Sequence, residues 1–186
     1  MADLVLTLIG ADRPGLVEAV AEIVASHGGN WLESRMAHLA GQFAGILRIE
    51  VPEEKAKAVL AGLSALTDRG LRVAGEPSLE ERREAAGRTL ALELVGLDRP
   101  GIVREISQLL ASVGANVEEL ATDRSSAPMS GEMLFHAKAR VRLPGDADLA
   151  TLRAALERLA LDLMIEIRLV ETALEAKPQK VQETAE

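Results

Sequence analysis

Hydrophobic and polar residues alternate near the start of the chain, and the spacing then becomes helical. Leu4, Leu6 and Leu8 occupy every second position, which is typical of a β-strand with one buried face. A helix is predicted next, because apolar residues then recur three and four positions apart. They are Leu16, Val20, Ile23, Val24 and, half apolar, His27. The pair Gly28-Gly29 ends this helix.

Two strands, a second helix and a last strand complete the pattern. Residues 42–51 alternate again until Pro52 interrupts the run. The side that we expect to face the core carries Phe43, Gly45, Leu47, Ile49 and Val51. A helical stripe follows at Ala56, Val59, Leu60, Leu63 and Leu66, and a strand begins near Leu71. The predicted order is β-α-β-β-α-β.

The whole pattern occurs twice. Residues 4–33 and 90–119 align without a gap at a displacement of 86 positions, and both contain the turn Asp-Arg-Pro-Gly. The second copy predicts a helix with its stripe at Leu149, Leu152, Leu156 and Leu159, and a final strand over residues 161–170. It also has six extra residues, which we place in a longer hairpin loop around residues 124–131.

This order predicts the α+β class, as two ferredoxin-like units in tandem. Right-handed crossovers would put the first and third strands of each unit in the middle of the sheet, with both helices on one face. We expect domains at residues 1–76 and 90–171, a linker at 77–89 and a flexible tail at 172–186. Because units of this size are marginally stable alone, they are expected to pair through open sheet faces or strand edges.

Composition narrows the classes of function. The 186 residues carry a net charge of −8, and the only aromatic residues are Trp31, Phe43 and Phe135. Nucleic-acid binders favour a basic surface and often stacking rings, so direct DNA reading is not expected. The chain has no cysteine, and no apolar run approaches the length of a membrane span. A soluble protein in the cytoplasm is the expectation.

The turn between the first strand and helix of each copy is the main candidate for binding chemistry. Asp12 and Asp98 are predicted to cap the helices, with the following prolines in the first helical turn. Gly15 and Gly101 would then lie inside a helical turn, where glycine is costly, so something should approach closely there. Either a neighbouring backbone or a small anion, such as the carboxylate of an amino acid, fits this role.

Other polar residues give weaker signals. Asn30 and Asn116 follow the helix-ending glycines and could bind a zwitterion through their amide groups, or could simply be turn residues. The three histidines show no metal-binding spacing and no serine or cysteine nucleophile motif. No nucleotide loop is present. Three basic residues on one strand (Lys138, Arg140 and Arg142) are expected to pair with Asp162 and Glu166. Neither catalysis nor a cofactor is predicted.

A β-α-β-β-α-β unit with this turn and the later Gly-x-Asn resembles the ACT domain, a small regulatory module that binds amino acids. Two such units in one short chain are similar to the glycine cleavage system transcriptional repressor family, over about residues 4–170. The resemblance implies a protein that senses glycine or a related amino acid and acts on a DNA-binding activator protein without touching DNA. The ligand residues it implies are Gly10, Asp12, Gly15, Asn30, Gly96, Asp98, Gly101 and Asn116.

Some features leave alternatives open. Similar turns head phosphoserine phosphatases and formyltetrahydrofolate deformylases, whose catalytic domains this chain lacks. Trp31-Leu32 in the first copy corresponds to Val117-Glu118 in the second, so the two sites need not bind alike. Three hypotheses remain: an amino-acid-responsive regulator, an interaction module without a ligand, and a detached regulatory subunit of a metabolic enzyme. A homodimer is compatible with each.

Overall fold

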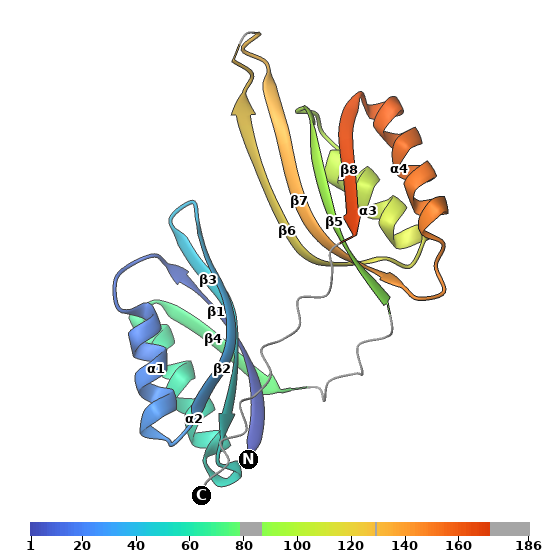
Figure 1. Ribbon diagram of the computed structural model, residues 1–186. Coiled ribbons are helices and arrows are strands. Elements are labelled where there is room, and N and C mark those ends of the chain that lie inside the picture. The colour runs from blue at the N-terminus through green and yellow to red at the C-terminus, as the bar shows by residue number, and fades with distance from the viewer. Residues whose placement is uncertain (79–86, 129, 172–186) are drawn as a thin grey trace, which may run out of the picture. The chain divides into compact units, whose positions relative to one another are not determined.

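The computed structural model describes residues 1–78, 87–128 and 130–171 (Figure 1). The chain divides into two compact units, unit 1 over residues 1–82 and unit 2 over residues 83–186. This division falls within the segment where a linker was expected. The tail expected at 172–186 lies outside the described residues.

Unit 1 has the predicted order of elements. Its strands and α-helices are β1 (Ala2–Ala11), α1 (Leu16–Ser26), β2 (Asn30–Leu39), β3 (Gln42–Val51), α2 (Ala56–Ser64) and β4 (Leu71–Pro77). Two short 3-10 helices, η1 (Glu53–Lys55) and η2 (Ala65–Arg69), flank α2. The antiparallel sheet has the order β2-β3-β1-β4, so the first and third strands are central, which confirms the topology that right-handed crossovers predict.

Unit 2 repeats this arrangement. Its elements are β5 (Gly87–Leu97), α3 (Ile102–Ser112), β6 (Asn116–Ser126), β7 (Met133–Pro144), α4 (Leu149–Leu163) and β8 (Ile165–Glu171). Its sheet order is β6-β7-β5-β8. In each unit both helices cover the same face of the sheet (Figure 1). The fold is therefore a tandem pair of ferredoxin-like domains in the α+β class, as expected.

Each unit has its own hydrophobic core between sheet and helices. In unit 1, Leu6, Leu47 and Ile49 from the two central strands are fully buried against helix residues such as Val20 and Val59. The core of unit 2 repeats this pattern with Leu90, Val141, Leu143, Ile106 and Leu152. A fully buried side chain of this kind stabilises the folded state by about 1.5–3 kcal/mol. The alternation of strand residues therefore identified the buried faces correctly.

The prediction for the last helix and strand of unit 2 was wrong at their boundary. Helix α4 continues to Leu163, and β8 begins only at Ile165. Leu163 is buried because it continues the helical stripe of Leu152 and Leu156, but it also fits the alternation of the strand that follows. The chain turns at Met164, which has left-handed backbone angles (φ 53°, ψ 48°).

Two further expectations concern the bounds of the linker and the hairpin loop of unit 2. Strand β4 extends to Pro77 and β5 begins at Gly87, so both enter the segment expected to be linker. The hairpin between β6 and β7 is longer than its counterpart in unit 1, and Ala127 N–H donates to Glu132 O at 2.8 Å across its loop. Met129 in this loop lies outside the described residues.

The basic residues of β7 pair with acidic residues other than those expected. Arg140 contacts Glu118 and Glu119 on β6 at 3.3 and 2.6 Å, and Lys138 lies 3.9 Å from Glu93 on β5. Asp162 belongs to helix α4 and not to the last strand. Cross-strand neighbours on one sheet face therefore neutralise these cations.

Candidate functional site

Helix α1 begins at Leu16, three residues later than the predicted cap would place it. Its N-cap is Gly15, and no side chain caps it. Asp12 instead donates its backbone N–H to Gly41 O at 2.9 Å, while its carboxylate lies 3.7 Å from His38 Nε2. The predicted capping role of Asp12 was therefore wrong, because the Arg-Pro-Gly turn separates it from the helix.

The same correction holds in unit 2. Gly101 is the N-cap of α3, again without a side-chain cap. Asp98 donates its N–H to Met133 O at 2.8 Å and accepts a hydrogen bond from Arg124 at 3.0 Å. Both aspartates therefore join the turn to the neighbouring β-hairpin.

Gly15 and Gly101 are required by backbone conformation. Their φ angles are +88° and +97°, in the left-handed region that favours glycine. A Cβ atom at Gly15 would lie 3.7 Å from Glu18 Oε2, an ordinary contact, and one at Gly101 would lie 3.6 Å from Glu105 Oε1. There is space beside both glycines within their own units, so the positive φ angles account for them, and the expected approach of a backbone or a small anion stays a prediction.

Gly10 and Gly96 have a packing role. A Cβ atom at Gly10 would collide with the carbonyl oxygen of Gly70, and one at Gly96 would collide with the side chain of Ile165. In each unit this contact lets the last strand lie close against the central strand. Both residues lie on a strand, and Gly10 is buried.

Asn30 and Asn116 lie at the other end of their units. In the register of the sheet, Asn30 lies opposite Glu50, and Glu50 lies opposite Asp3 on β1. Along β1, Asp3 is seven residues away from Gly10. At about 3.4 Å per strand residue, this separation is about 24 Å. Asn116 has the same placement, through Arg142 and Thr89. Within one unit, then, the asparagine and the glycine turn cannot touch the same small ligand.

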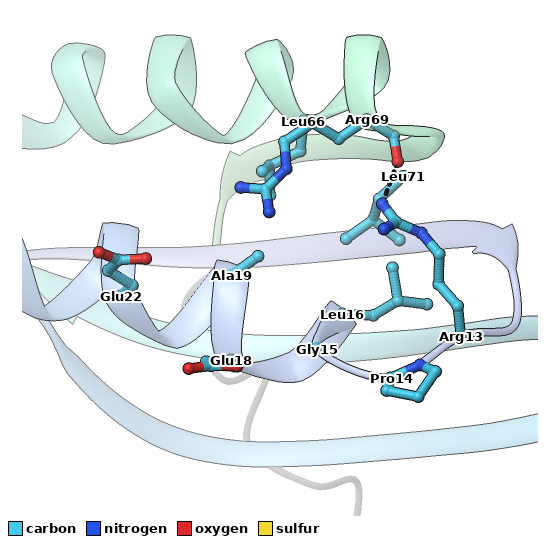
Figure 2. Close-up of a pocket in the computed structure, with 10 residues that line it drawn as sticks. All are labelled: Arg13, Pro14, Gly15, Leu16, Glu18, Ala19, Glu22, Leu66, Arg69 and Leu71. Carbon is cyan, nitrogen blue, oxygen red and sulfur yellow. Dashed lines mark hydrogen bonds between the residues drawn. The ribbon is translucent and has the colours of Figure 1, made fainter.

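A cavity of about 320 Å³ opens beside the glycine turn of unit 1 (Figure 2). It lies between the first half of α1 and the end of η2, and Leu16, Leu66 and Leu71 form its apolar side. Four charged side chains also line it: Arg13, Arg69, Glu18 and Glu22. The Arg13 guanidinium donates a hydrogen bond to the Arg69 carbonyl oxygen and so ties the turn to η2.

The charges of this cavity suit a zwitterion. Two guanidinium groups and two carboxylates lie around one small space, and the first N–H groups of α1 point toward its turn without a side-chain cap. Helix α4 shows the contrasting case. There Asp148 accepts hydrogen bonds from Ala150 N, Thr151 N and the Thr151 hydroxyl, at 3.0, 3.1 and 2.6 Å. The hydroxyl bond, followed by the Ala150 bond, lowers the pKa of Asp148 from 3.8.

Unit 2 does not preserve these charges. Arg99 corresponds to Arg13, but it lies 3.5 Å from Glu105. At the positions of Glu18 and Glu22, unit 2 has Arg104 and Gln108. Aligning β8 on β4 through Gly96 and Gly10 puts buried Leu163 at the position of Arg69. The mixed-charge cavity is thus a property of unit 1.

Sequence reasoning missed Glu18, Glu22 and Arg69, and it passed over Arg13 within the turn that it singled out. A position-by-position comparison of the two copies could have found Glu18 and Glu22, because the second copy has a cation or an amide at those two positions. Arg69 had no such signal, since its place beside the turn depends on how η2 and β4 fold back.

The three histidines have separate partners, and His38 is the one that lies beside Asp12. His27 Nδ1 lies 2.8 Å from Ile23 O at the end of α1. His136 Nε2 lies 2.7 Å from Ser125 Oγ, a pairing that the sequence did not suggest, but both side chains are exposed on an open hairpin. In the part of the chain that the structure describes, no cluster of acidic residues and histidines could hold a metal ion.

The fold defines a class of protein, a tandem pair of ferredoxin-like domains, and unit 1 is similar to the ACT domain. The family model of the ACT domain matches residues 2–73, which cover unit 1 up to β4. Unit 2 has the same order of elements, sheet topology and glycine-started helix. Within residues 1–78, 87–128 and 130–171, no helix is long and apolar enough to cross a bilayer.

Particular relatives extend the similarity beyond unit 1 to most of the chain. The glycine cleavage system transcriptional repressor of Escherichia coli (strain K12) is 25% identical over 164 residues, 86% of this chain and 85% of the repressor. A crystal structure of an unknown protein from Galdieria sulphuraria has a TM-score of 0.83 and 28% identity, over 92% of this chain and 99% of that chain. A putative glycine cleavage system transcriptional repressor, 21% identical, has a TM-score of 0.67 over 92% of this chain and 97% of its own, and supports the fold alone.

Proposed function

We propose that this chain is an amino-acid-responsive regulator whose ligand binds beside the glycine turn of unit 1. The observation that carries the proposal is the 320 Å³ cavity with two arginines and two glutamates. The carboxylate of an amino acid would lie toward Arg13, Arg69 and the start of α1, where cations and free N–H groups favour an anion. Its ammonium group would lie toward Glu22.

The ligand class is a small amino acid, and glycine is the first candidate. The space is small, its apolar side consists of leucine side chains, and the name of the E. coli relative links that protein to glycine cleavage. Of the residues that the resemblance implied, Gly15 remains in this site as the residue that shapes the turn. Asp12 and Asp98 hold the turn against the hairpin, and they act on binding only through its position.

Regulation would pass through a protein partner, a transcriptional activator in the case that the resemblance implies. The net charge of −8 disfavours a phosphate backbone, so direct DNA binding is not part of the proposal. A ligand can change the engagement of such a partner only if it binds one conformation better than another. The turn is suited to this, because it connects α1, η2 and the hairpin through single hydrogen bonds.

Thermal melting with added amino acids tests the ligand site. We expect glycine or a close analogue to raise the melting temperature, since a ligand at about 100 times its Kd adds about 2.7 kcal/mol to the free energy of unfolding. Arg13→Ala and Glu22→Gln should each abolish this shift. The matched control is Arg99→Ala in unit 2, which should leave the shift unchanged.

Two outcomes would contradict the ligand proposal. If no amino acid shifts the melting temperature, the hypothesis of an interaction module without a ligand is favoured. If Arg13→Ala and Arg99→Ala respond equally, the site lies elsewhere. The partner is tested separately by affinity capture from cells: recovery of a metabolic enzyme in place of a transcription factor would favour the detached regulatory subunit.

A further inference from the structure

In each unit one backbone hydrogen bond joins the glycine turn to the neighbouring hairpin, β2–β3 in unit 1 and β6–β7 in unit 2. Asp12 N–H donates to Gly41 O at 2.9 Å, and Asp98 N–H donates to Met133 O at 2.8 Å. The side chain of the same aspartate also meets a basic side chain of the hairpin in both units. The backbone contact is thus shared, and the units differ in the basic residue beside it.

This basic residue is a histidine in unit 1 and an arginine in unit 2. His38 Nε2 lies 3.7 Å from Asp12 Oδ2, and Arg124 Nη1 lies 3.0 Å from Asp98 Oδ2. The two positions are equivalent, because each lies opposite the phenylalanine that faces the first glycine of the turn motif. Arginine is always charged, whereas histidine changes its charge between about pH 5 and 8. The ion pair is therefore permanent in unit 2 and depends on pH in unit 1.

The surroundings of His38 leave Asp12 as its charged partner. The other charged residues of the turn, α1 and β2 are Arg13, Glu18, Glu22, Glu33 and Arg35. The arginine of the turn is hydrogen-bonded toward η2, the two acidic residues of α1 line the cavity on that side, and the two residues of β2 pair with each other. Residues 42–45 of β3 have no ionisable side chain. Within the described ranges, Asp12 is the one carboxylate at ion-pair distance from His38.

We propose that His38 is a positioning residue for the ligand site of unit 1, which in its protonated form holds Asp12 and the glycine turn against the hairpin. The cavity beside Gly15 is formed with the turn in this position. A ligand binds more tightly when a larger fraction of the protein is in the binding conformation, so affinity should rise as the pH falls. This consequence for the ligand rests on the proposed function, whereas the hold on the turn does not.

The size of the effect is set by the exposure of the pair. The side chains of His38 and Asp12 are 57% and 44% exposed, so water screens their attraction. We expect a change of about two- to fivefold between about pH 8 and about pH 5.5, both in the hold on the turn and in ligand affinity.

Amide hydrogen exchange of the full chain at several pH values tests the hold without any ligand. The protection of Asp12 N–H, corrected for the intrinsic exchange rate, should rise by about two- to fivefold as the pH falls over this range. Asp98 N–H makes the same kind of hydrogen bond beside a permanent cation. Its protection should stay constant, and it serves as a control within the same sample.

Substitutions separate the charge of His38 from its shape. His38→Arg copies unit 2 and should keep Asp12 N–H protected at every pH, whereas His38→Gln should give the low value throughout. Asp12→Asn should also remove the pH dependence. His27→Gln is the matched control, because His27 contacts the Ile23 carbonyl oxygen at the other end of α1. It should keep the wild-type profile.

Two results would overturn the hold on the turn: a constant protection of Asp12 N–H in the wild type, or a pH dependence that persists in His38→Arg. Calorimetric titration with glycine at both pH values tests the consequence for binding, which should depend on pH in the wild type and not in His38→Arg. Equal glycine affinity at both pH values in the wild type would refute the positioning role. If glycine and its analogues bind at neither pH, the proposed function fails, and the exchange profiles still decide whether His38 holds the turn.

Discussion

At the scale of single residues, the glycines of the two turns have separate physical reasons. Gly15 and Gly101 supply positive φ angles with open space around them, whereas Gly10 and Gly96 allow a neighbouring strand or side chain to approach. The motif Gly-x-Asp-Arg-Pro-Gly therefore contains one packing position and one conformational position. Only the second borders the proposed ligand cavity.

These two roles predict that alanine substitutions at the glycines lower the free energy of unfolding by different amounts. Gly15→Ala should lower the free energy of unfolding by about 1–2 kcal/mol, the cost of a left-handed backbone for an L-residue. Gly15→Asn should cost less, because asparagine tolerates this conformation. Gly10→Ala should cost more than Gly15→Ala, since its Cβ would collide with the Gly70 carbonyl oxygen. Urea unfolding of the three variants checks this order, and equal losses for the two alanine variants would contradict it.

At the scale of elements, the helices differ in how their N-termini are satisfied. Helices α1 and α3 start at a glycine without a side-chain cap, and α4 starts at Asp148, which accepts three hydrogen bonds. Both helices that begin beside the turn shared by the two copies are thus uncapped, and so is α2, whose N-cap is Lys55. An uncapped terminus keeps N–H groups free for a ligand, while a capped one stabilises the helix itself.

The cap of α4 predicts a pH dependence. The pKa of Asp148 is lowered in the folded state, so its stabilising effect is fully present above the ordinary value of 3.8 and is lost as the pH falls through the lower, folded value. Asp148→Asn should therefore be less stable than the wild type at neutral pH, and the difference should shrink below about pH 4. Chemical unfolding at several pH values measures it. A difference that grows on acidification would contradict the assignment.

At the scale of the whole molecule, one duplicated sequence has produced two units with different surfaces. Both retain the same kind of core and the same topology. The mixed-charge cavity lies in unit 1, whereas cross-strand ion pairs occur in both units, such as Arg48 with Asp3 in unit 1 and Lys138 with Glu93 in unit 2. We infer that the contacts with the ligand are concentrated in unit 1.

Separate cores predict a local response to core truncation. Leu6→Ala should destabilise unit 1 by about 2–5 kcal/mol, because Leu6 is fully buried in its core. Hydrogen exchange should then show lost protection in β1 and β3 and unchanged protection in β5 and β7. Leu92→Ala is the matched variant and should show the reverse. Equal loss of protection in both units would contradict this view.

Much of the fold could be predicted from local pattern. The alternation of Leu4, Leu6 and Leu8 and the helical recurrence of Leu16, Val20 and Val24 reflect which side chains are buried, and those residues are indeed in the core. The end of α4 could not be predicted in this way, because Leu163 satisfies both periodicities. The turn at Met164, which separates helix from strand, depends on a backbone conformation that its residue type does not indicate.

The sequence by itself determined the duplication, the order of elements and the buried faces, because these follow from the spacing of apolar residues along one chain. Tertiary structure decided where the polar residues meet. It placed Arg69 beside Arg13, because a chain that reverses direction brings together residues far apart in sequence. It also placed Asn30 at the end of the sheet opposite to the glycine turn. It also put Thr7 against Ile46, a pairing that depends on the register between strands and cannot be read from either strand alone.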